Sequence, residues 1–223
     1  MARSRRAKRK EAVRELLLRR DIEGIRGLTR KRPTVVSALA GFLSETDDLL
    51  RWRAIEALGW TVADLAEDDL EPARVQVRRQ LWTMTEESGG TAWHAPEAVG
   101  EILYRVPALA KEFTSVLAGN GDTEPFEAGV LWAMGRLAHG PGRAGAQDAL
   151  SLFLWALGSA DPAQRGYAAI AVGELNLGEA VGKLRRLLKD EATFNRYDFD
   201  RGELRRSSVG ELASASLARF ARQ

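Results

Sequence analysis

Small and apolar residues recur along this chain with the spacing of one helix face. Around Gly173 they lie five, two and one residues before the glycine and two residues after it: Ala168, Ala171, Val172 and Leu175. At 100° per residue, these positions fall on one side of an α-helix. Because that side is lined mainly by Gly and Ala, a second helix can approach it closely, and the pattern predicts a packed helix.

The same frame repeats around three more glycines and one alanine: Gly59, Gly100, Gly135 and Ala213. With Gly173 included, successive anchors are 41, 35, 38 and 40 residues apart, a regularity typical of helical solenoids. Each copy follows another amphipathic segment: Thr34–Ser44, Pro72–Glu86, Leu109–Leu117, Gly145–Leu157 and Glu179–Leu188.

These repeats predict an all-α fold, arranged as a superhelix of about five helix pairs plus an N-terminal helix. The anchor glycines should occupy equivalent places in successive repeats. Three alanines that lie two residues before an anchor should be buried: Ala57, Ala133 and Ala171.

The two best copies, RWRAIEALG and RGYAAIAVGEL, make residues 34 to 220 resemble HEAT repeats. The resemblance is strongest to the short bacterial kind that also occurs in phycobilin lyases. It implies a solenoid in which the second helix of each pair lines a concave groove. Solenoids of this kind serve as scaffolds, lyases, hydroxylases and nucleic-acid binders, so the fold alone does not decide the function.

Charge divides the chain into two unequal parts. Residues 1–33 hold 13 Lys and Arg against 4 Asp and Glu, a formal charge of +9, whereas the remaining 190 residues carry −7. We therefore expect a basic N-terminal arm and capping helix at 1–33 and a repeat solenoid at 34–223, together forming one domain. The absence of cysteine excludes disulfides, thiolate metal sites and a cysteine nucleophile, and it suits a cytoplasmic location. No apolar run is long enough for a membrane span.

The basic arm is a candidate for phosphate contacts through six residues: Arg3, Arg5, Arg6, Lys8, Arg9 and Lys10. Each phosphate neutralised by such a contact makes affinity fall with salt. The alternative is a solvated tail whose helix caps the first repeat, because terminal repeats need a polar outer face.

One row of the repeated helix faces away from the small-residue side and should form the groove floor. Four of the six tryptophans fall on it, mixed with charged residues, which is typical of a binding surface. The expected groove residues are Trp52, Arg53, Glu56, Trp60, Trp93, His94, Glu97, Glu101, Trp132, Arg136, Tyr167 and Glu174. The alternative is that the rings lie across neighbouring helices and only fill gaps.

The stretch Asp190–Arg201 is the longest segment without a helical pattern. It carries aromatic and acidic residues in alternation: Phe194, Tyr197, Asp198, Phe199 and Asp200. We expect an irregular loop that either forms a binding lip or packs its rings onto the edge of the solenoid.

Neither a catalytic signature nor a metal site is expected. Deoxyhypusine hydroxylase holds iron with repeated His-Glu pairs on similar helices, but His94 is followed by Ala95 and the one other histidine is His139. HEAT-like alkylpurine DNA glycosylases share the combination of Trp, acid and Arg seen at Trp93, Glu97 and Arg136. The acidic body departs from that family, because duplex binding needs neutralised phosphates.

The sequence favours a non-enzymatic, cytoplasmic scaffold that binds a protein or peptide segment in its groove, without cofactor or metal. The tryptophans would be the apolar anchors, and Glu56, Glu97 and Glu101 would select basic or amide groups. The alternative is nucleic-acid binding led by the basic arm, with or without base chemistry. No membrane partner is expected.

Overall fold

The computed structural model describes residues 2–85, 93–140 and 142–221, with side chains from residue 7 onward. Thirteen α-helices and one β-hairpin make up this part of the chain. The helices are α1 (Ala2–Leu18), α2 (Ile22–Lys31), α3 (Val35–Ala40), α4 (Asp48–Leu65), α5 (Leu70–Thr85), α6 (Ala95–Arg105), α7 (Ala110–Ala118), α8 (Glu127–Leu137), α9 (Arg143–Gln147), α10 (Leu150–Ala156), α11 (Pro162–Leu175), α12 (Val181–Arg186) and α13 (Val209–Phe220). Two 3₁₀ turns, η1 (Pro107–Leu109) and η2 (Gly178–Ala180), precede α7 and α12.

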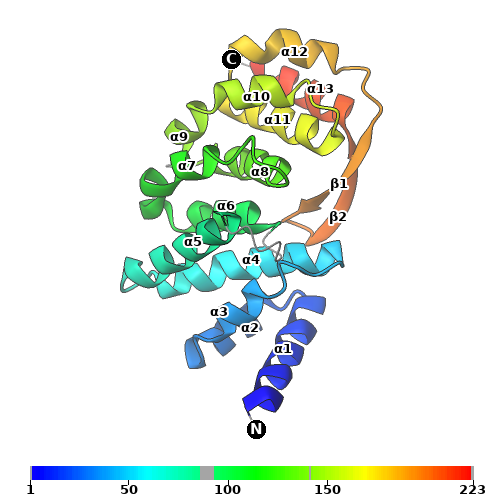
Figure 1. The fold of residues 1–223 in the computed structure, drawn as a ribbon. Helices are drawn as coiled ribbons and strands as arrows, with labels where there is room; N and C mark the ends of the chain where they lie inside the picture. Colours follow the sequence, from blue (N-terminus) through cyan, green and yellow to red (C-terminus); the bar gives the residue numbers. More distant parts are fainter. Residues whose placement is uncertain (1, 86–92, 141, 222–223) are drawn as a thin grey trace.

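The helices form five successive pairs, as the repeats predict. The second member of each pair carries the repeat anchor, and these inner helices are α4, α6, α8, α11 and α13. The outer helices of these pairs are α3, α5, α7, α9 together with α10, and α12. Figure 1 shows the pairs stacked from α3–α4 to α12–α13, with α1 and α2 packed at the first end.

Neighbouring inner helices touch where the anchor glycines lie. A Cβ atom built on Gly100 would be 2.5 Å from Ala133 Cβ, and one on Gly135 would be 3.6 Å from Ala171 Cβ. On Gly173 it would be 2.6 Å from Ser216 Oγ. Since each anchor faces the next inner helix, these glycines occupy equivalent places, as expected.

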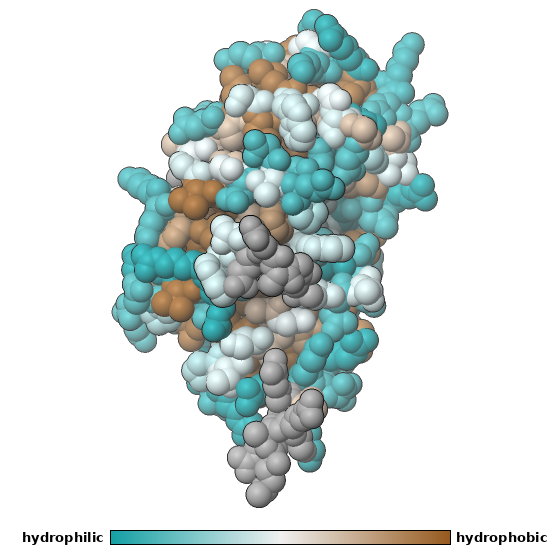
Figure 2. All heavy atoms as spheres, viewed as in Figure 1, coloured by the Kyte–Doolittle hydropathy of each residue, from teal (hydrophilic) through white to brown (hydrophobic). Residues whose placement is uncertain are grey.

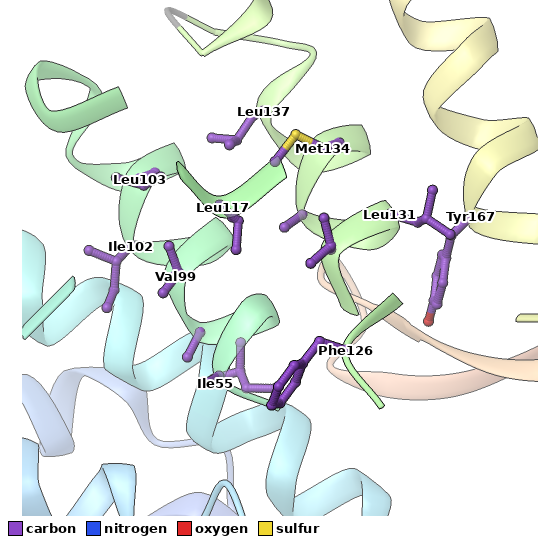
Figure 3. Packing of buried hydrophobic residues seen from close by; sticks show 14 of the residues in the cluster. Ile55, Val99, Ile102, Leu103, Leu117, Phe126, Leu131, Met134, Leu137 and Tyr167 are labelled. Carbon is purple, nitrogen blue, oxygen red and sulfur yellow. The ribbon is translucent and has the colours of Figure 1, made fainter. Parts of the chain in front are cut away.

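Apolar side chains from inner and outer helices fill a shared core. Figure 3 shows Val99 and Ile102 of α6, Leu117 of α7 and Met134 of α8 directed into one layer, and all four are buried. The predicted alanines Ala57, Ala133 and Ala171 are fully buried as well. The small-residue face of each inner helix therefore serves helix packing.

The segment after α12 departs from the sequence prediction. Instead of an irregular loop, it forms an antiparallel hairpin of β1 (Thr193–Asp198) and β2 (Glu203–Ser208), with Tyr197 opposite Leu204. Figure 1 shows the hairpin running beside the inner helices from the α12–α13 end to α4. Ser208 ends β2 and caps α13 in a reciprocal capping box with Glu211, so the hairpin is tied to the last repeat.

We predict opposite effects of adding one methyl group at two anchors. Gly100→Ala should lower the free energy of unfolding by about 1–3 kcal/mol, because the new Cβ would overlap Ala133 of the next helix. Gly135→Ala should be neutral or stabilising by up to about 1 kcal/mol, because its Cβ would make an ordinary contact and Ala favours helix. Urea unfolding of both variants tests this, and equal losses would refute the assigned spacing of the inner helices.

Candidate functional site

Much of the predicted groove floor is buried, partly under the hairpin and partly between neighbouring inner helices. Four residues expected to face solvent there, Trp52, Glu56, Glu97 and Glu101, are buried. This corrects the sequence prediction, which took the side opposite the small residues as open. The hairpin covers Trp52 and Glu56 on α4, whereas Glu97 and Glu101 of α6 are buried against Gly129 of α8 and Gly59 of α4.

An aromatic cluster joins the hairpin to the inner helices. The Trp52 ring stacks on Tyr197 of β1, with centroids 5.8 Å apart and planes 3° from parallel. Trp52 also meets Trp132 edge-on at 5.0 Å, and Phe199 packs against Trp132 at 5.9 Å. Aromatic pairs of this kind contribute about 0.5–1.5 kcal/mol each beyond their area burial. Trp52 and Trp132, which the sequence predicts as anchors for a partner, thus pack against aromatic rings of the same chain.

Glu56 binds the hairpin through a charged hydrogen-bond network. The Tyr197 hydroxyl donates to Glu56 Oε2 at 2.6 Å, and Arg20 Nη2 donates to Glu56 Oε1 at 2.8 Å. Burial and the hydrogen bond to Glu56 raise the pKa of the Tyr197 phenol well above its ordinary value. The hydrogen bond to Glu56 also raises the pKa of Arg20, against the opposing effect of burial. The phenol therefore stays neutral, and the carboxylate accepts three hydrogen bonds from two side chains.

The hairpin tip is fixed to the first repeat by backbone carbonyls. Arg53 donates to Gly202 O through Nε and Nη2, at 3.2 and 3.1 Å, and Arg20 donates to the carbonyl of Phe199. Gly202 has φ of +70°, a conformation that residues with a Cβ rarely adopt. Hydrogen bonds from backbone N–H groups of the turn hold the pKa of Asp198 below its usual value. The conformation of the turn thus presents backbone carbonyls to Arg20 and Arg53.

A second buried carboxylate lies deeper on the inner face. Glu101 accepts from Arg105 Nε at 2.5 Å and from Arg136 Nε at 2.8 Å. Burial raises the pKa of Glu101, and the two guanidinium groups oppose that rise. Trp60, another expected anchor, lies beneath two guanidinium groups, Arg105 at 3.7 Å and Arg26 at 5.1 Å from its ring centroid. Both predicted binding residues are therefore engaged within the chain.

Glu97 is the one inner-face carboxylate with an unsatisfied oxygen among the described residues. His94 Nδ1 lies 2.9 Å from its Oε1, but its buried Oε2 has no hydrogen-bond partner. A Cβ built on Gly129 of α8 would be 2.5 Å from that oxygen, so the carboxylate is packed against the next helix. The tight packing accounts for the missing donor and leaves no adjoining space for a ligand.

One cavity remains open between the hairpin and the later repeats. It measures about 340 Å³ and is bordered by Trp132 and Arg136 of α8, Tyr167 and Ile170 of α11, and residues 196–200 of the hairpin. Arg136 lies over the Phe199 ring at 4.3 Å, so the cavity wall is both aromatic and charged. This volume is within the range of about 300–1,000 Å³ found for ligand sites.

The position of the cavity relative to β1 indicates an open strand edge. Successive residues of a strand point to opposite faces, so a space bordered by Arg196, Tyr197 and Asp198 together lies at the edge rather than on one face. Among the described residues the sheet has two strands, and β2 occupies one edge of β1. The residues of β1 that border the cavity therefore belong to a strand whose other edge pairs with no described strand.

Trp93 lies apart from the aromatic cluster. Its side chain is 64% exposed, as predicted, just before α6. With His94, Arg51 and Leu43 it borders a small hollow of about 240 Å³. The two tryptophans that the repeat pattern did not place on the groove, Trp82 and Trp155, are also exposed, at 60% and 51%. Two of these three exposed tryptophans thus lie on the outer helices α5 and α10, outside the predicted groove.

Three of the remaining predicted residues have partners within the chain. Tyr167 is buried edge-on against Phe194 of β1 at 5.1 Å, and Glu174 accepts from Arg219 at 2.7 Å. In the arm, Lys10 pairs with Glu45 at 3.0 Å, whereas Lys8 and Arg9 border a separate cavity. The side chains of Arg3, Arg5 and Arg6 lie outside the described residues.

Comparisons with known proteins do not identify the chain. It matches no protein-family model and no curated protein. Within the described ranges, no cluster of three or more His, Cys, Asp or Glu residues could hold a metal ion. No helix in that part of the chain is long and apolar enough to cross a bilayer. The function must therefore be argued from the site itself.

Sequence reasoning missed the residues that complete the inner face. The repeat pattern does not indicate Arg20, and it places Tyr197 in an irregular loop, whereas Tyr197 lies in β1 and Phe199 in the turn that follows. A signal was present, because Thr193, Phe194 and Tyr197 favour strands and a glycine at position 202 suits a hairpin turn. The partner of this hairpin on α4 is about 140 residues away in sequence, as the Tyr197–Glu56 bond shows, and no local pattern reports that distance.

We predict that Tyr197→Phe loosens the hairpin and changes the alkaline stability. Losing the bond to Glu56 should cost about 1–3 kcal/mol of the free energy of unfolding at neutral pH. The folded-state pKa of the phenol lies above that of the unfolded chain, about 10, so its contribution is intact below pH 10 and falls as the pH rises further. Denaturant unfolding between pH 7 and 11 should show the two proteins converging; a constant difference would count against this assignment.

We predict that Trp93 contributes little to stability. Trp93→Ala should change the free energy of unfolding by less than about 0.5 kcal/mol, because the ring is mostly in solvent. Trp52→Ala is the matched control and should cost about 3–5 kcal/mol, because that ring is buried against Trp132 and Tyr197. A large loss for Trp93→Ala would show that the ring is core packing.

Proposed function

We propose that this chain is a non-enzymatic solenoid of the HEAT-like type that binds an extended segment of a partner protein. The segment lies in the cavity between β1 and the inner helices α8 and α11. The observation that carries the proposal is the free edge of β1 beside that cavity. An extended peptide can add to such an edge as a third strand, and main-chain hydrogen bonds then supply affinity.

The walls of the cavity support side-chain selection by the same site. Tyr167 and Ile170 offer apolar surface on α11, while Arg196 and Asp200 offer opposite charges on the hairpin. Strand addition places alternate side chains of the peptide toward such a wall. We therefore expect the bound peptides to carry an apolar residue and, two positions later, a charged residue.

The buried carboxylates favour a binding role over acid–base catalysis. Glu56 is held by Arg20 and Tyr197, and Glu101 is held by two arginines. These groups organise the hairpin and the inner helices instead of facing the cavity. A cytoplasmic setting completes the proposal, since a chain without cysteine suits a reducing compartment.

The proposal predicts that one substitution closes the site. Peptides selected from a random display library on the full chain should bind Ile170→Arg at least about tenfold more weakly, because the long side chain fills the cavity. Val116→Arg on outer helix α7 is the matched control, since Val116 is exposed and outside the cavity. Fluorescence anisotropy with the selected peptides measures both. Selection without enrichment, or unchanged binding by Ile170→Arg, would remove the proposal.

Backbone methylation of a selected peptide separates strand addition from other modes of binding. Alternate N–H groups of an added strand bond to the sheet and the intervening ones do not. N-methylation should therefore weaken binding strongly at every second residue and weakly between. A uniform effect would refute strand addition even if the cavity binds the peptide.

A further inference from the structure

A second cavity lies at the opposite end of the molecule from α13, between α1, α2 and α3. It measures about 490 Å³ and is lined by three cations, Lys8, Arg9 and Arg32, above an apolar floor of Ala12, Leu28 and Val35. No carboxylate is among the lining residues. Figure 2, viewed as in Figure 1, shows hydrophilic residues beside the grey atoms at this lower end of the molecule.

The three cations lack the carboxylate partners that their neighbours have. Lys10 and Arg14 on the same helix pair with Glu45, and Arg26 and Arg30 of α2 pair with Asp64. Among the described residues, no such ion pair forms at Lys8, Arg9 or Arg32. Several cations near the cavity are thus paired with carboxylates, whereas the three that line it form no ion pair to a described residue.

Arg9 supplies an independent sign that an anion is missing. Its Nε is buried and has no hydrogen-bond partner. A buried donor without an acceptor costs free energy, and in most structures such donors are satisfied. An anion in the cavity would place acceptors beside the Arg9 guanidinium, while Lys8 and Arg32 balance its charge.

The distribution of charge favours a long polyanion over an isolated phosphate. The cavity is lined by residues of the basic part of the chain, since residues 1–33 carry +9 whereas the rest of the chain carries −7. A polyanion can follow the basic end while the acidic body repels it, so contact is confined to the first helices. The apolar floor suits the sugar or base beside a bound phosphate.

We propose that this cavity binds a backbone phosphate of a nucleic acid, with Lys8, Arg9 and Arg32 as its cations. The site is distinct from the cavity beside β1 and does not depend on the proposed peptide binding. Its recognition is of charge, because the three cations are assigned to the phosphate and the rest of the lining is apolar, and phosphate contacts carry no base sequence.

The test compares two triple variants of the full chain that lose the same charge. The cavity variant carries Lys8→Gln, Arg9→Gln and Arg32→Gln, and the control carries Arg19→Gln, Lys31→Gln and Arg79→Gln, three exposed cations outside the cavity. Binding of labelled 20-nucleotide single strands and duplexes is followed by anisotropy between 50 and 200 mM salt. Thermal unfolding of both variants confirms that each remains folded.

The cavity variant should bind at least about tenfold more weakly and should lose about one unit of the salt slope, because one phosphate contact is removed, whereas the control should lose less than about threefold in affinity. Equal losses in both variants would show diffuse attraction and overturn the site. No binding of either oligonucleotide at 50 mM salt would also overturn it. Competition by millimolar inorganic phosphate, or preference for phosphatidylserine vesicles over the oligonucleotides, would reassign the cavity to a free anion or a lipid surface and refute the nucleic-acid proposal.

Discussion

The close contact between successive inner helices is the constraint on which the rest of this structure depends. Gly100 meets Ala133 so tightly that a single added methyl group would overlap it. The same closeness lets the ring of Trp132 pass over α6, 3.3 Å from where a Cβ of Gly100 would lie, and reach Trp52 on α4. The aromatic platform that receives the hairpin therefore exists only because the helices beneath it carry no larger side chains.

The repeat could be predicted from sequence because its physical cause is local. The small residues of each helix face lie within about ten positions of one another in the sequence. The burial of Ala57, Ala133 and Ala171 therefore follows from helix geometry alone. The exposure of the opposite face is not a local property. The predicted exposure is wrong at Glu56, because Tyr197, 141 residues later in the sequence, lies over that side chain. A helical pattern cannot report which distant segment will cover a surface.

The inner face nevertheless binds the kinds of group that its sequence suggested. The tryptophans were expected to take aromatic or apolar side chains, and the acids to take basic ones. Trp52 stacks on Tyr197, and Glu56 binds Arg20, so the chain's own segments provide both groups. What residue chemistry could not decide is whether the bound groups come from the same chain or from a partner. The cavity beside Ile170 is the part of that face that the chain leaves open.

The hairpin also changes how the solenoid holds together. In a simple repeat array each unit contacts only its neighbours, so the ends unfold independently. Here β2 leads directly into α13 of the last repeat, while Arg53 of the first repeat binds Gly202 at the tip across 149 residues of sequence. Opening either end must therefore break contacts made by the other. Because the tip closes the array through buried aromatic and charged groups, the five repeats should unfold as one unit rather than fray from their ends.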